Sequence, residues 1–581
     1  MSDFQVSGTN AAALFTLKVH RGDGMCLLAM NWKKGTPPKE FVGFAIEYKE
    51  PNGDRFFALK NRLAFPGVGG KVDDAKKSTL LSPIQKFRWV HFPRNAELPG
   101  AFTYKVKPVF MNDKDELSYG EPQQVEIELR RETYPDLLNV TFTRGFVSSQ
   151  AFVDKYVAKG QKPNAVIATL LPGKAADGLT FKTKHPKAQE ALEWMGFEAR
   201  SAILEVLDEA IADSTAEVRA VVYDLNEPGM VSRLEKLGKR LKIIIDDDGA
   251  HGEATSAETA AAKRLAKTAA LVTRQHVGKL QHNKTIVVDG KVQACVCGST
   301  NHSWRGFFVQ NNNAIILRGA TPVKIFMDAY DAYETKGSVA GFGGTGSAVW
   351  NDLKLNGIDA QIGFSPRSPH NAVLKTIADD IANHTTSSLF FSLAFLYQTP
   401  GVIRDAVKKI QKDAAVFSYG ISDHAVKGLS NDGADGPVTV ALKKPGGKVT
   451  VIHPKELTNA PEPFKGEPTG GGGTRMHHKF VVIDFDKPTA RVYMGSYNFS
   501  SAADVTNGEN LLLIRDRRIA VSYVVEAVRI FDHYDFRVAQ TDAKKARKKL
   551  QLAKPPRNGE RAWWQEDYTN PRKILDRELF A

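Results

Sequence analysis

The stretch His282-Asn-Lys284-Thr-Ile-Val-Val-Asp289, followed by Gly298-Ser299-Thr300-Asn301, has a second copy in the same chain. Residues 477–484 read His-His-Lys-Phe-Val-Val-Ile-Asp and residues 495–498 read Gly-Ser-Tyr-Asn, so the two first histidines are 195 positions apart. In each copy the apolar run after the lysine predicts a buried β-strand, with histidine and lysine on one face. Asp289-Gly290 predicts a tight turn into a return strand that brings the Gly-Ser-x-Asn corner beside the histidine. The chain is therefore expected to contain two copies of one site.

These motifs carry a resemblance to a known family. His282-x-Lys284-x4-Asp289 and His477-x-Lys479-x4-Asp484, each with its corner, resemble the two HKD motifs of the phospholipase D superfamily. A single H-x-K-x4-D recurs by chance in long chains, whereas two copies followed by the same corner are specific. The resemblance implies a phosphodiesterase that works without a cofactor or a metal.

Length and composition bound the class of protein. The 581 residues predict several domains, and 42% hydrophobic with 25% charged residues is typical of globular proteins. No signal peptide and no long uncharged apolar stretch is recognisable, so we expect a cytoplasmic protein, with peripheral membrane attachment or signal-independent export as alternatives. Cys26, Cys295 and Cys297 form no disulfide framework and are expected to be buried. A net charge of +14 favours an anionic partner, either nucleic acid or an acidic membrane.

Residues 1–130 and the C-terminal end differ in pattern from the rest. Short β-like runs separated by turns predict an all-β sandwich over 1–130, and this region resembles a fibronectin type III or immunoglobulin-like module of unknown partner. The carrying segments are Phe41 to Tyr48, Trp89 and Phe102 to Val109. The tail 541–581 has 11 Lys or Arg against 6 Asp or Glu and contains Trp563-Trp564. These tryptophans either bind phosphates or a bilayer, or pack on the protein body.

Between these ends, strands and helices alternate and the pattern occurs twice. The first lobe, 138–336, and the second lobe, 351–540, share three landmarks, which predicts two pseudo-symmetric phospholipase D-like α/β lobes. Residues 337–350 are expected to be a flexible Gly-rich linker, because Gly341-Phe-Gly343-Gly344-Thr-Gly346 lacks the strand and helix that a nucleotide-binding loop requires. Gly470 to Gly473 predicts either a mobile loop over the site or a plain connection.

The two motifs supply what phosphodiester cleavage requires: a nucleophile, an acid and fixed positive charge. Lys284, Lys479, Asn301 and Asn498 are expected to bind the phosphate oxygens. The family resemblance implies that His282 attacks to form a phosphohistidine and that His477 acts as general acid and base. Asp289 and Asp484 are expected to tether the turns, and Ser299 and Ser496 to form the corners with a hydrogen bond towards the intermediate.

One difference separates the two halves. Eleven residues after the corner asparagine stands Asn312 in the first half and Glu509 in the second, where the family places a residue that hydrogen-bonds a catalytic imidazole. Because this support commonly crosses between lobes in the family, we expect Glu509 behind His282 and Asn312 behind His477. A carboxylate makes the imidazole a better nucleophile than an amide does. An amide at the first position resembles tyrosyl-DNA phosphodiesterase.

Two substrates are compatible with this reading. Hydrolysis of a phospholipid head group is favoured, because two motifs in one chain are usual for phospholipases and phosphatidyltransferases of the superfamily. A nuclease or nucleic-acid phosphodiesterase is the alternative, supported by the net charge and Asn312. Aromatic and aliphatic residues near the motifs either line a route for an acyl chain or a bilayer contact, or belong to the core. They are Trp304, Phe307, Phe308, Val309, Phe395, Leu396 and Tyr397.

Overall fold

The computed structural model describes residues 3–67, 76–129, 132–145, 160–422, 476–545 and 547–581, with a few single positions between these ranges. Contacts divide this part of the chain into two units. The first comprises residues up to 129 together with 521–581, and the second comprises 132–422 and 476–520. The loop predicted at Gly470 to Gly473 lies outside the described residues.

The first unit contains two antiparallel sheets around a shared core, as the all-β prediction for its N-terminal part requires. One sheet has the order β1-β2-β3-β6, and the other has β5-β4-β7-β8 with β9 paired to β7. Phe15, Leu17 and Val19 alternate with more exposed residues along β2, which is the period-2 pattern of a strand with one buried face. The strands are β1 Gln5–Ser7, β2 Phe15–Arg21, β3 Cys26–Trp32, β4 Phe41–Lys49, β5 Phe57–Ala58, β6 Arg88–His91, β7 Ala101–Met111, β8 Leu117–Tyr119 and β9 Gln123–Glu128.

The C-terminal segment belongs to this first unit. Helices α13 (Glu566–Thr569) and α14 (Pro571–Phe580) follow Trp563 and Trp564, which pack against the sandwich core. The indole N–H of Trp563 donates to the Phe41 carbonyl at 3.1 Å, and its ring stacks on Phe87 with centroids 5.4 Å apart. Of the two roles considered for these tryptophans, packing on the protein is therefore the one that the structure has. Residues 521–540, assigned from sequence to the second lobe, also group with this unit.

The second unit contains two seven-stranded mixed sheets, and the predicted α/β class is confirmed. The first sheet runs β10-β16-β15-β14-β11-β12-β13, and the second runs β17-β18-β23-β22-β21-β19-β20, so six strands correspond and β13 and β17 are additions at opposite ends. In both sheets the strand before the first helical crossover pairs in parallel with the next strand and antiparallel with the motif strand. Because the order and direction of these six strands agree, the two halves share one duplicated α/β design.

Each half of the second unit contributes seven described strands. The first-half strands are β10 Leu138–Phe142, β11 Glu217–Val222, β12 Leu241–Ile245, β13 Leu271–Arg274, β14 Lys284–Asp289, β15 Gln293–Gly298 and β16 Asn313–Arg318. The second-half strands are β17 Asn351–Asp352, β18 Asp359–Ser365, β19 Ser388–Leu393, β20 Phe417–Ile421, β21 Lys479–Ile483, β22 Arg491–Gly495 and β23 Glu509–Arg515.

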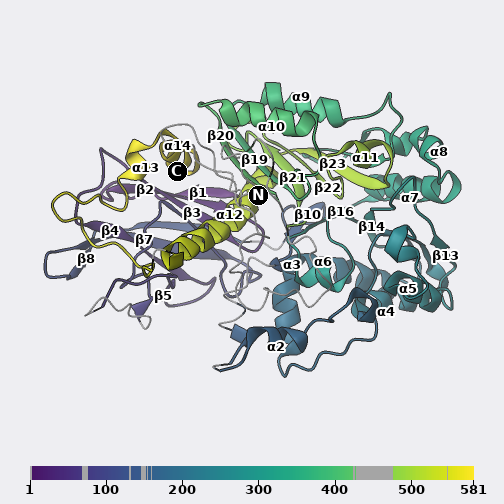
Figure 1. Ribbon diagram of the computed structural model, residues 1–581, viewed down its shortest axis with the longest axis horizontal. Coiled ribbons are helices and arrows are strands. Elements are labelled where there is room, and N and C mark those ends of the chain that lie inside the picture. Colours follow the sequence, from purple (N-terminus) through teal and green to yellow (C-terminus); the bar gives the residue numbers. More distant parts are fainter. Residues whose placement is uncertain are drawn as a thin grey trace. The chain divides into compact units, whose positions relative to one another are not determined.

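Helices connect these strands and cover the sheets; α9 and α10, for example, lie side by side in Figure 1. The first-half helices are α2 Pro163–Ala168, η4 Ala175–Asp177, α3 Ala188–Ala212, α4 Pro228–Leu237, η5 Gly238–Arg240, η6 Gly249–Gly252, α5 Ala257–Leu265, α6 Trp304–Phe308 and α7 Ala320–Thr335. The others are α8 Val339–Gly343, η7 Gly346–Ala348, α9 Leu374–His384, α10 Val402–Lys412, α11 Ser501–Val505 and α12 Arg517–Lys545, which begins in the second unit and continues into the first.

The segment between the halves differs from its prediction. Residues 337–350 were expected to be a flexible linker, but they contain α8 and η7. The Ser338 hydroxyl caps α8 by accepting from the Gly341 N–H at 3.0 Å. Phe342 is fully buried and stacks on Tyr333 with ring centroids 4.0 Å apart. One aromatic anchor and one cap therefore hold a segment whose glycine content alone favours flexibility.

Two further expectations concern burial and membranes. Cys26, Cys295 and Cys297 are buried free thiols, as predicted, and burial raises the pKa of the Cys26 thiol to about 12. Over the described ranges, none of the helices combines the length and the apolar character that crossing a bilayer requires.

Candidate active site

The two motif histidines face each other within the second unit. His282 precedes β14 and His477 precedes β21; their ring centroids lie 6.3 Å apart with the rings inclined by 72°. Two isolated bridges hold this geometry, because Gln281 pairs with Gly508 and Met476 pairs with Asn311 across the halves. A reacting atom lies about 3 to 3.5 Å from its partner before a bond forms. The separation of the rings therefore suits one phosphorus between two imidazoles.

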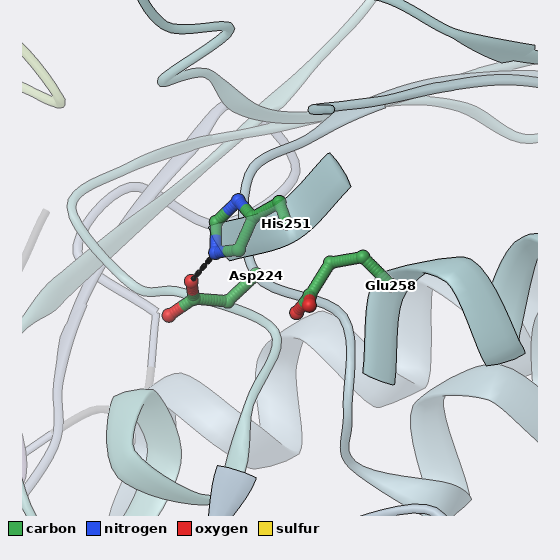
Figure 2. Close-up of side chains that lie close together, drawn as sticks. All are labelled: Asp224, His251 and Glu258. Atoms are coloured by element: carbon green, nitrogen blue, oxygen red, sulfur yellow. Dashed lines mark ion pairs between the residues drawn. The ribbon is translucent and has the colours of Figure 1, made fainter. Parts of the chain in front are cut away.

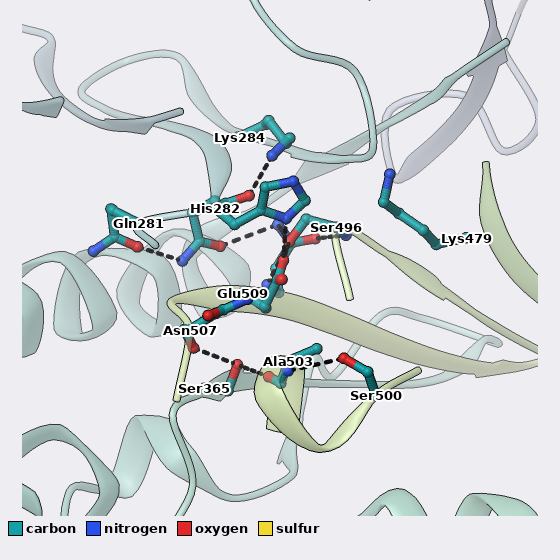
Figure 3. Close-up of polar contacts among 12 residues, drawn as sticks. Gln281, His282, Lys284, Ser365, Lys479, Ser496, Ser500, Ala503, Asn507 and Glu509 are labelled. Carbon is teal, nitrogen blue, oxygen red and sulfur yellow. Dashed lines mark hydrogen bonds and ion pairs between the residues drawn. The ribbon is translucent and has the colours of Figure 1, made fainter. Parts of the chain in front are cut away.

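Each motif lysine lies beside its histidine in the fully buried first position of the motif strand. The Lys479 ammonium donates to the His477 carbonyl at 2.7 Å, and Lys284 donates to the His282 carbonyl in the same way (Figure 3). Burial lowers the pKa of Lys284 to about 8 against the opposing charge of Glu509. Burial and the charge of Lys284 hold the pKa of Lys479 well below its usual range. A bound phosphate would reverse this trend, because an anion favours the charged amines.

The supports behind the histidines cross between the halves, as predicted. His282 Nδ1 lies 2.7 Å from Glu509 Oε2, and His477 Nδ1 lies 2.8 Å from Asn312 Oδ1. The amide group of Asn312 donates to the Gly306 carbonyl at 2.9 Å, so its oxygen faces His477. His477 must therefore donate through Nδ1, which leaves Nε2 directed away from the support.

Burial and neighbouring charges control protonation of the site. Burial, with the added charge of Lys284, lowers the pKa of His282 well below its usual value, and burial with Lys479 does the same for His477. Burial also raises the pKa of Glu509 to about 8, although Lys284 and Ser496 oppose this shift. The buried His282 and Glu509 pair therefore loses a proton near pH 8, and above that pH a neutral His282 faces a carboxylate.

The corner serines lie behind the histidines. The Ser496 hydroxyl donates to Glu509 Oε2 at 2.6 Å, and the Ser299 hydroxyl donates to Asn312 Oδ1 at 3.0 Å. Their hydrogen bonds thus fix the two supports, whereas the sequence had predicted hydrogen bonds towards the intermediate. The preceding Gly298 has φ of 127°, and a Cβ atom there would lie 2.6 Å from the Asn313 carbonyl oxygen. Only glycine fits this corner without strain.

The two motif aspartates differ in role. Asp484 is fully buried with φ of 52°, and its carboxylate accepts backbone N–H bonds from Thr386, Ser387 and Ser388 at 2.8 to 3.1 Å. It tethers the turn as predicted. Asp289 is exposed, and the tether at the corresponding turn comes instead from Asp213, whose carboxylate accepts from Lys291 N at 2.7 Å. The prediction for Asp289 is therefore wrong, because a different loop supplies the acceptor.

Both histidines open onto a cavity of about 1050 Å³ that Asn301 and Asn498 also line. Its first-half wall carries mainly polar groups, whereas its second-half wall mixes apolar and polar groups. The first half contributes Tyr223, Asp224, Asn301, Arg305 and Gln310 with the apolar Leu280; the second half contributes the apolar residues Pro369, Ala372, Leu374, Phe395, Pro400, Val402, Ile403, Phe499, Ala502 and Val505 and the polar residues Lys375, Gln398, Thr399, Asn498, Ser500, Ser501, Asp504 and Asn507. Nearly all apolar residues of the cavity therefore belong to the second half.

Of the seven aromatic and aliphatic residues that the sequence singled out near the motifs, only Phe395 lines this cavity. Five of the others are at most 5% exposed and belong to the core: Trp304, Phe307, Phe308, Val309 and Leu396. The core interpretation is correct for these five. Tyr397 is partly exposed outside the cavity lining.

Several residues of the site were missed from the sequence. Tyr223 and Asp224 directly follow β11, and Tyr223 packs against His282 with ring centroids 4.8 Å apart. Phe395, which the sequence had singled out, lies beside His477 with ring centroids 6.3 Å apart. The carboxyl end of a strand next to a parallel neighbour is a common binding position. That rule would have found Tyr223 and Asp224.

An acidic cluster lies beside the catalytic cavity. Asp224, His251 and Glu258 offer ligand atoms within 4.8 Å of one another, a spacing that a metal ion also requires (Figure 2). Both nitrogens of His251, however, already contact carboxylates: Nε2 lies 3.1 Å from Asp224 and Nδ1 lies 2.8 Å from Asp246. Hydrogen bonding therefore accounts for this donor set.

Comparison with known families identifies the domain. A family model described as "Cardiolipin synthase, PLD-like domain" matches residues 207–333 and 440–531, which include both motif histidines. The chain contains a PLD-like domain. The first matched stretch contains the first motif and the second contains the second motif, so both duplicated halves contribute to the PLD-like domain.

Individual relatives of the PLD-like domain match over short stretches. Phospholipase D of Rickettsia felis is 46% identical over 48 residues, 8% of this chain and 22% of the relative. Phospholipase D of Rickettsia conorii is 31% identical over 124 residues, 21% of this chain and 58% of the relative. The crystal structure of phosphatidylserine synthase from Haemophilus influenzae superimposes with a TM-score of 0.40 at 12% identity, covering 61% of this chain and 92% of that one. The match thus spans less than two thirds of the length of each Rickettsia relative.

Proposed function

We propose that this protein is a phosphodiesterase of the phospholipase D type that hydrolyses a head-group phosphodiester of a phospholipid through a covalent phosphohistidine. The observation that carries the proposal is the crossed pair of imidazoles, each with a lysine beside it and a support from the opposite half. Such a pair supplies a nucleophile, an acid and positive charge around one phosphate.

In this mechanism His282 is the nucleophile. Its Nε2 lone pair attacks phosphorus while Nδ1–H donates to Glu509, so an N–P bond forms and the bond from phosphorus to the head-group oxygen breaks. The negative charge of the bound phosphodiester favours the doubly protonated imidazole of His477, which gives its Nε2 proton to the departing alcohol and keeps Nδ1–H on Asn312. His477 then takes a proton from water, whose oxygen attacks phosphorus and releases His282. Lys284, Lys479, Asn301 and Asn498 hold the non-bridging oxygens throughout.

Two observations favour a lipid. Most apolar residues of the cavity, among them Phe395, Val402 and Ile403, belong to its second-half wall, which suits an acyl chain next to the phosphate. Val402 is 37% exposed at the start of α10, so these apolar residues continue to the surface. The two Rickettsia relatives are also named phospholipase D.

A nucleic-acid phosphodiesterase is the second candidate. Its support is the net charge of +14 and the amide at Asn312, where a second carboxylate is common in phospholipases. Nucleic-acid binding depends steeply on salt concentration, whereas cleavage at a lipid interface depends mainly on the interface. The two candidates therefore differ in a measurable way.

The deciding experiment compares the full chain with its His282→Ala and His276→Gln variants. His276 is an exposed histidine paired with Asp247 at 2.7 Å outside the cavity, so its substitution is a matched control. Each protein meets mixed phospholipid vesicles and single- and double-stranded DNA and RNA, with and without EDTA. Head-group release by wild type and His276→Gln alone supports the proposal. Shortened nucleic acid with intact lipid would establish the second candidate instead.

A further inference from the structure

A chain of hydrogen bonds leads from a buried carboxylate to the edge of the catalytic cavity. Asp246 is fully buried and accepts from His251 Nδ1 at 2.8 Å. His251 Nε2 lies 3.1 Å from Asp224 Oδ1, and Asp224 Oδ2 accepts from the Asn301 side-chain amide at 2.7 Å. Asn301 is 4% exposed and lines the cavity with both histidines. We propose that Asp246, His251 and Asp224 are positioning residues that orient Asn301 towards the substrate phosphate.

The anchor of this chain is tied to the first motif. Asp246 Oδ1 accepts from the Gln281 N–H at 2.6 Å, and Gln281 directly precedes His282. Asp246 therefore holds both the backbone at the proposed nucleophile and the imidazole of His251. A shift at either contact reaches the phosphate site.

The protonation states of His251 and Asp224 fix the direction of the hydrogen bonds between them. Burial alone would lower the pKa of His251, but its contacts with Asp224 and Asp246 raise the pKa to about 10, so both ring nitrogens carry protons at neutral pH. Burial alone would raise the pKa of Asp224, yet the bond and charge of His251 leave it below the usual value. Glu258 faces the same imidazole, and the Arg274 guanidinium donates to the His251 carbonyl at 2.6 Å.

The ionised Asp224 decides which way the Asn301 amide points. One amide N–H binds the carboxylate, and a flipped amide would place its oxygen against a negative charge instead. The second N–H is therefore kept as a donor for a phosphate oxygen. Among the described residues the Asn301 oxygen is buried and has no hydrogen-bond partner, so no other contact competes for the orientation.

Among its described residues, the second half has no equivalent chain of hydrogen bonds. The ends of the corresponding strands align Val222 with Leu393 and Ile245 with Ile421, which places Phe395 at the position of Asp224 and Ser422 at the position of Asp246. The phenyl ring of Phe395 offers no acceptor to Asn498. Among the described residues, the hydrogen-bond chain therefore occurs only in the half that contains His282. Duplication of the fold does not by itself explain its presence.

The inference rests on the proposed role of Asn301 in holding the phosphate, and binding of inorganic phosphate tests it without turnover. Calorimetry on the full chain compares wild type with Asp224→Asn, His251→Gln and Asn301→Ala, and with His276→Gln as the control. Losing an oriented hydrogen bond to an anion is expected to weaken phosphate binding about tenfold in the first three variants and not in the control.

A double variant separates orientation from a general structural role. If Asp224 acts through Asn301, phosphate binds Asp224→Asn/Asn301→Ala as it binds Asn301→Ala, since neighbours in one network are not additive. The proposal would be refuted if the two substitutions lowered phosphate affinity additively. It would also be refuted if Asp224→Asn, with the thermal unfolding of wild type, bound phosphate as tightly as wild type. Binding by wild type only with an added divalent cation, abolished in Asp224→Asn, would replace it with a metal site. Phosphate binding without lipid hydrolysis would retain the chain while refuting the proposed function.

Discussion

Replacing Glu509 with glutamine is the sharpest test of the crossed supports. Glu509 Oε2 lies 2.7 Å from His282 Nδ1 and 2.6 Å from the Ser496 hydroxyl. Both groups donate to this one oxygen, so a glutamine can keep both contacts by placing its carbonyl oxygen at the position of Oε2. The variant therefore removes the negative charge but keeps the geometry, and it converts the support of His282 into that of His477.

The expected loss follows from the bond that changes. A hydrogen bond to a charged group contributes about 1.5 to 3 kcal/mol and a neutral one about 0.5 to 1.5 kcal/mol. The buried charge also stabilises the positive imidazole of the transition state, so we expect a total loss of about 2 to 3 kcal/mol. This is about 30- to 150-fold in the rate of phosphohistidine formation. Release of the phosphoryl group, which depends on His477, changes less.

The pH dependence gives a second readout of the same variant. Burial raises the pKa of Glu509 to about 8, so in wild type the rate of phosphohistidine formation rises as pH increases through 8. Burial lowers the pKa of Lys284 to about 8 as well, so loss of its charge causes a descending limb above that pH. In Glu509→Gln the ascending limb disappears. Rapid-quench measurement of phosphoenzyme between pH 6 and 10 checks this, and an unchanged ascending limb or an undiminished rate would refute the role of Glu509.

Three further predictions concern stability. Burial raises the pKa of Glu509 to about 8 from an unfolded value of about 4.3, so wild type loses stability as pH rises from 4 to 8. Glu509→Gln has no such carboxyl and should gain stability relative to wild type over this range, on the order of a few kcal/mol. Calorimetric unfolding at several pH values measures the difference. Asp484→Ala should lose about 2 to 4 kcal/mol in denaturant unfolding, because three backbone donors lose their acceptor, while exposed Asp289→Ala stays within about 0.5 kcal/mol. Gly298→Ala should lose about 1 to 3 kcal/mol and most activity, because its Cβ would displace the Asn313 carbonyl; wild-type activity would contradict this.

Local sequence patterns predicted much of this architecture. The apolar runs after Lys284 and Lys479 form the predicted strands, and the repeated corner places each serine and support at matching positions. Even the crossing of Glu509 to His282 followed from one difference between the two copies read with the family resemblance. These features were accessible because they depend on residues close in sequence, or on a repeat that relates distant ones.

The features that were missed depend on tertiary contacts. Asp213 rather than Asp289 tethers the first turn because a loop 78 residues earlier reaches the Lys291 N–H. Phe342 orders a glycine-rich segment by stacking on Tyr333. His251 reaches Asp224 from a short 3₁₀ turn, Gly249–Gly252, without any motif around it. Periodicity and spacing contain no information about such partners.

The two departures from symmetry both concern His282. Glu509 lies behind His282 whereas Asn312 lies behind His477, and Asp224 anchors Asn301 whereas Phe395 stands at the equivalent position in the second half. A duplicated site begins with two equivalent imidazoles, but a covalent mechanism needs one nucleophile and one acid. Carboxylate charge near one imidazole stabilises the positive form that attack on phosphorus creates, and an amide behind the other leaves its proton easier to release. The asymmetry of charge therefore favours phosphorylation of His282 in a His477→Ala variant, and phosphate trapped on His477 in the His282→Ala variant would reverse the assignment.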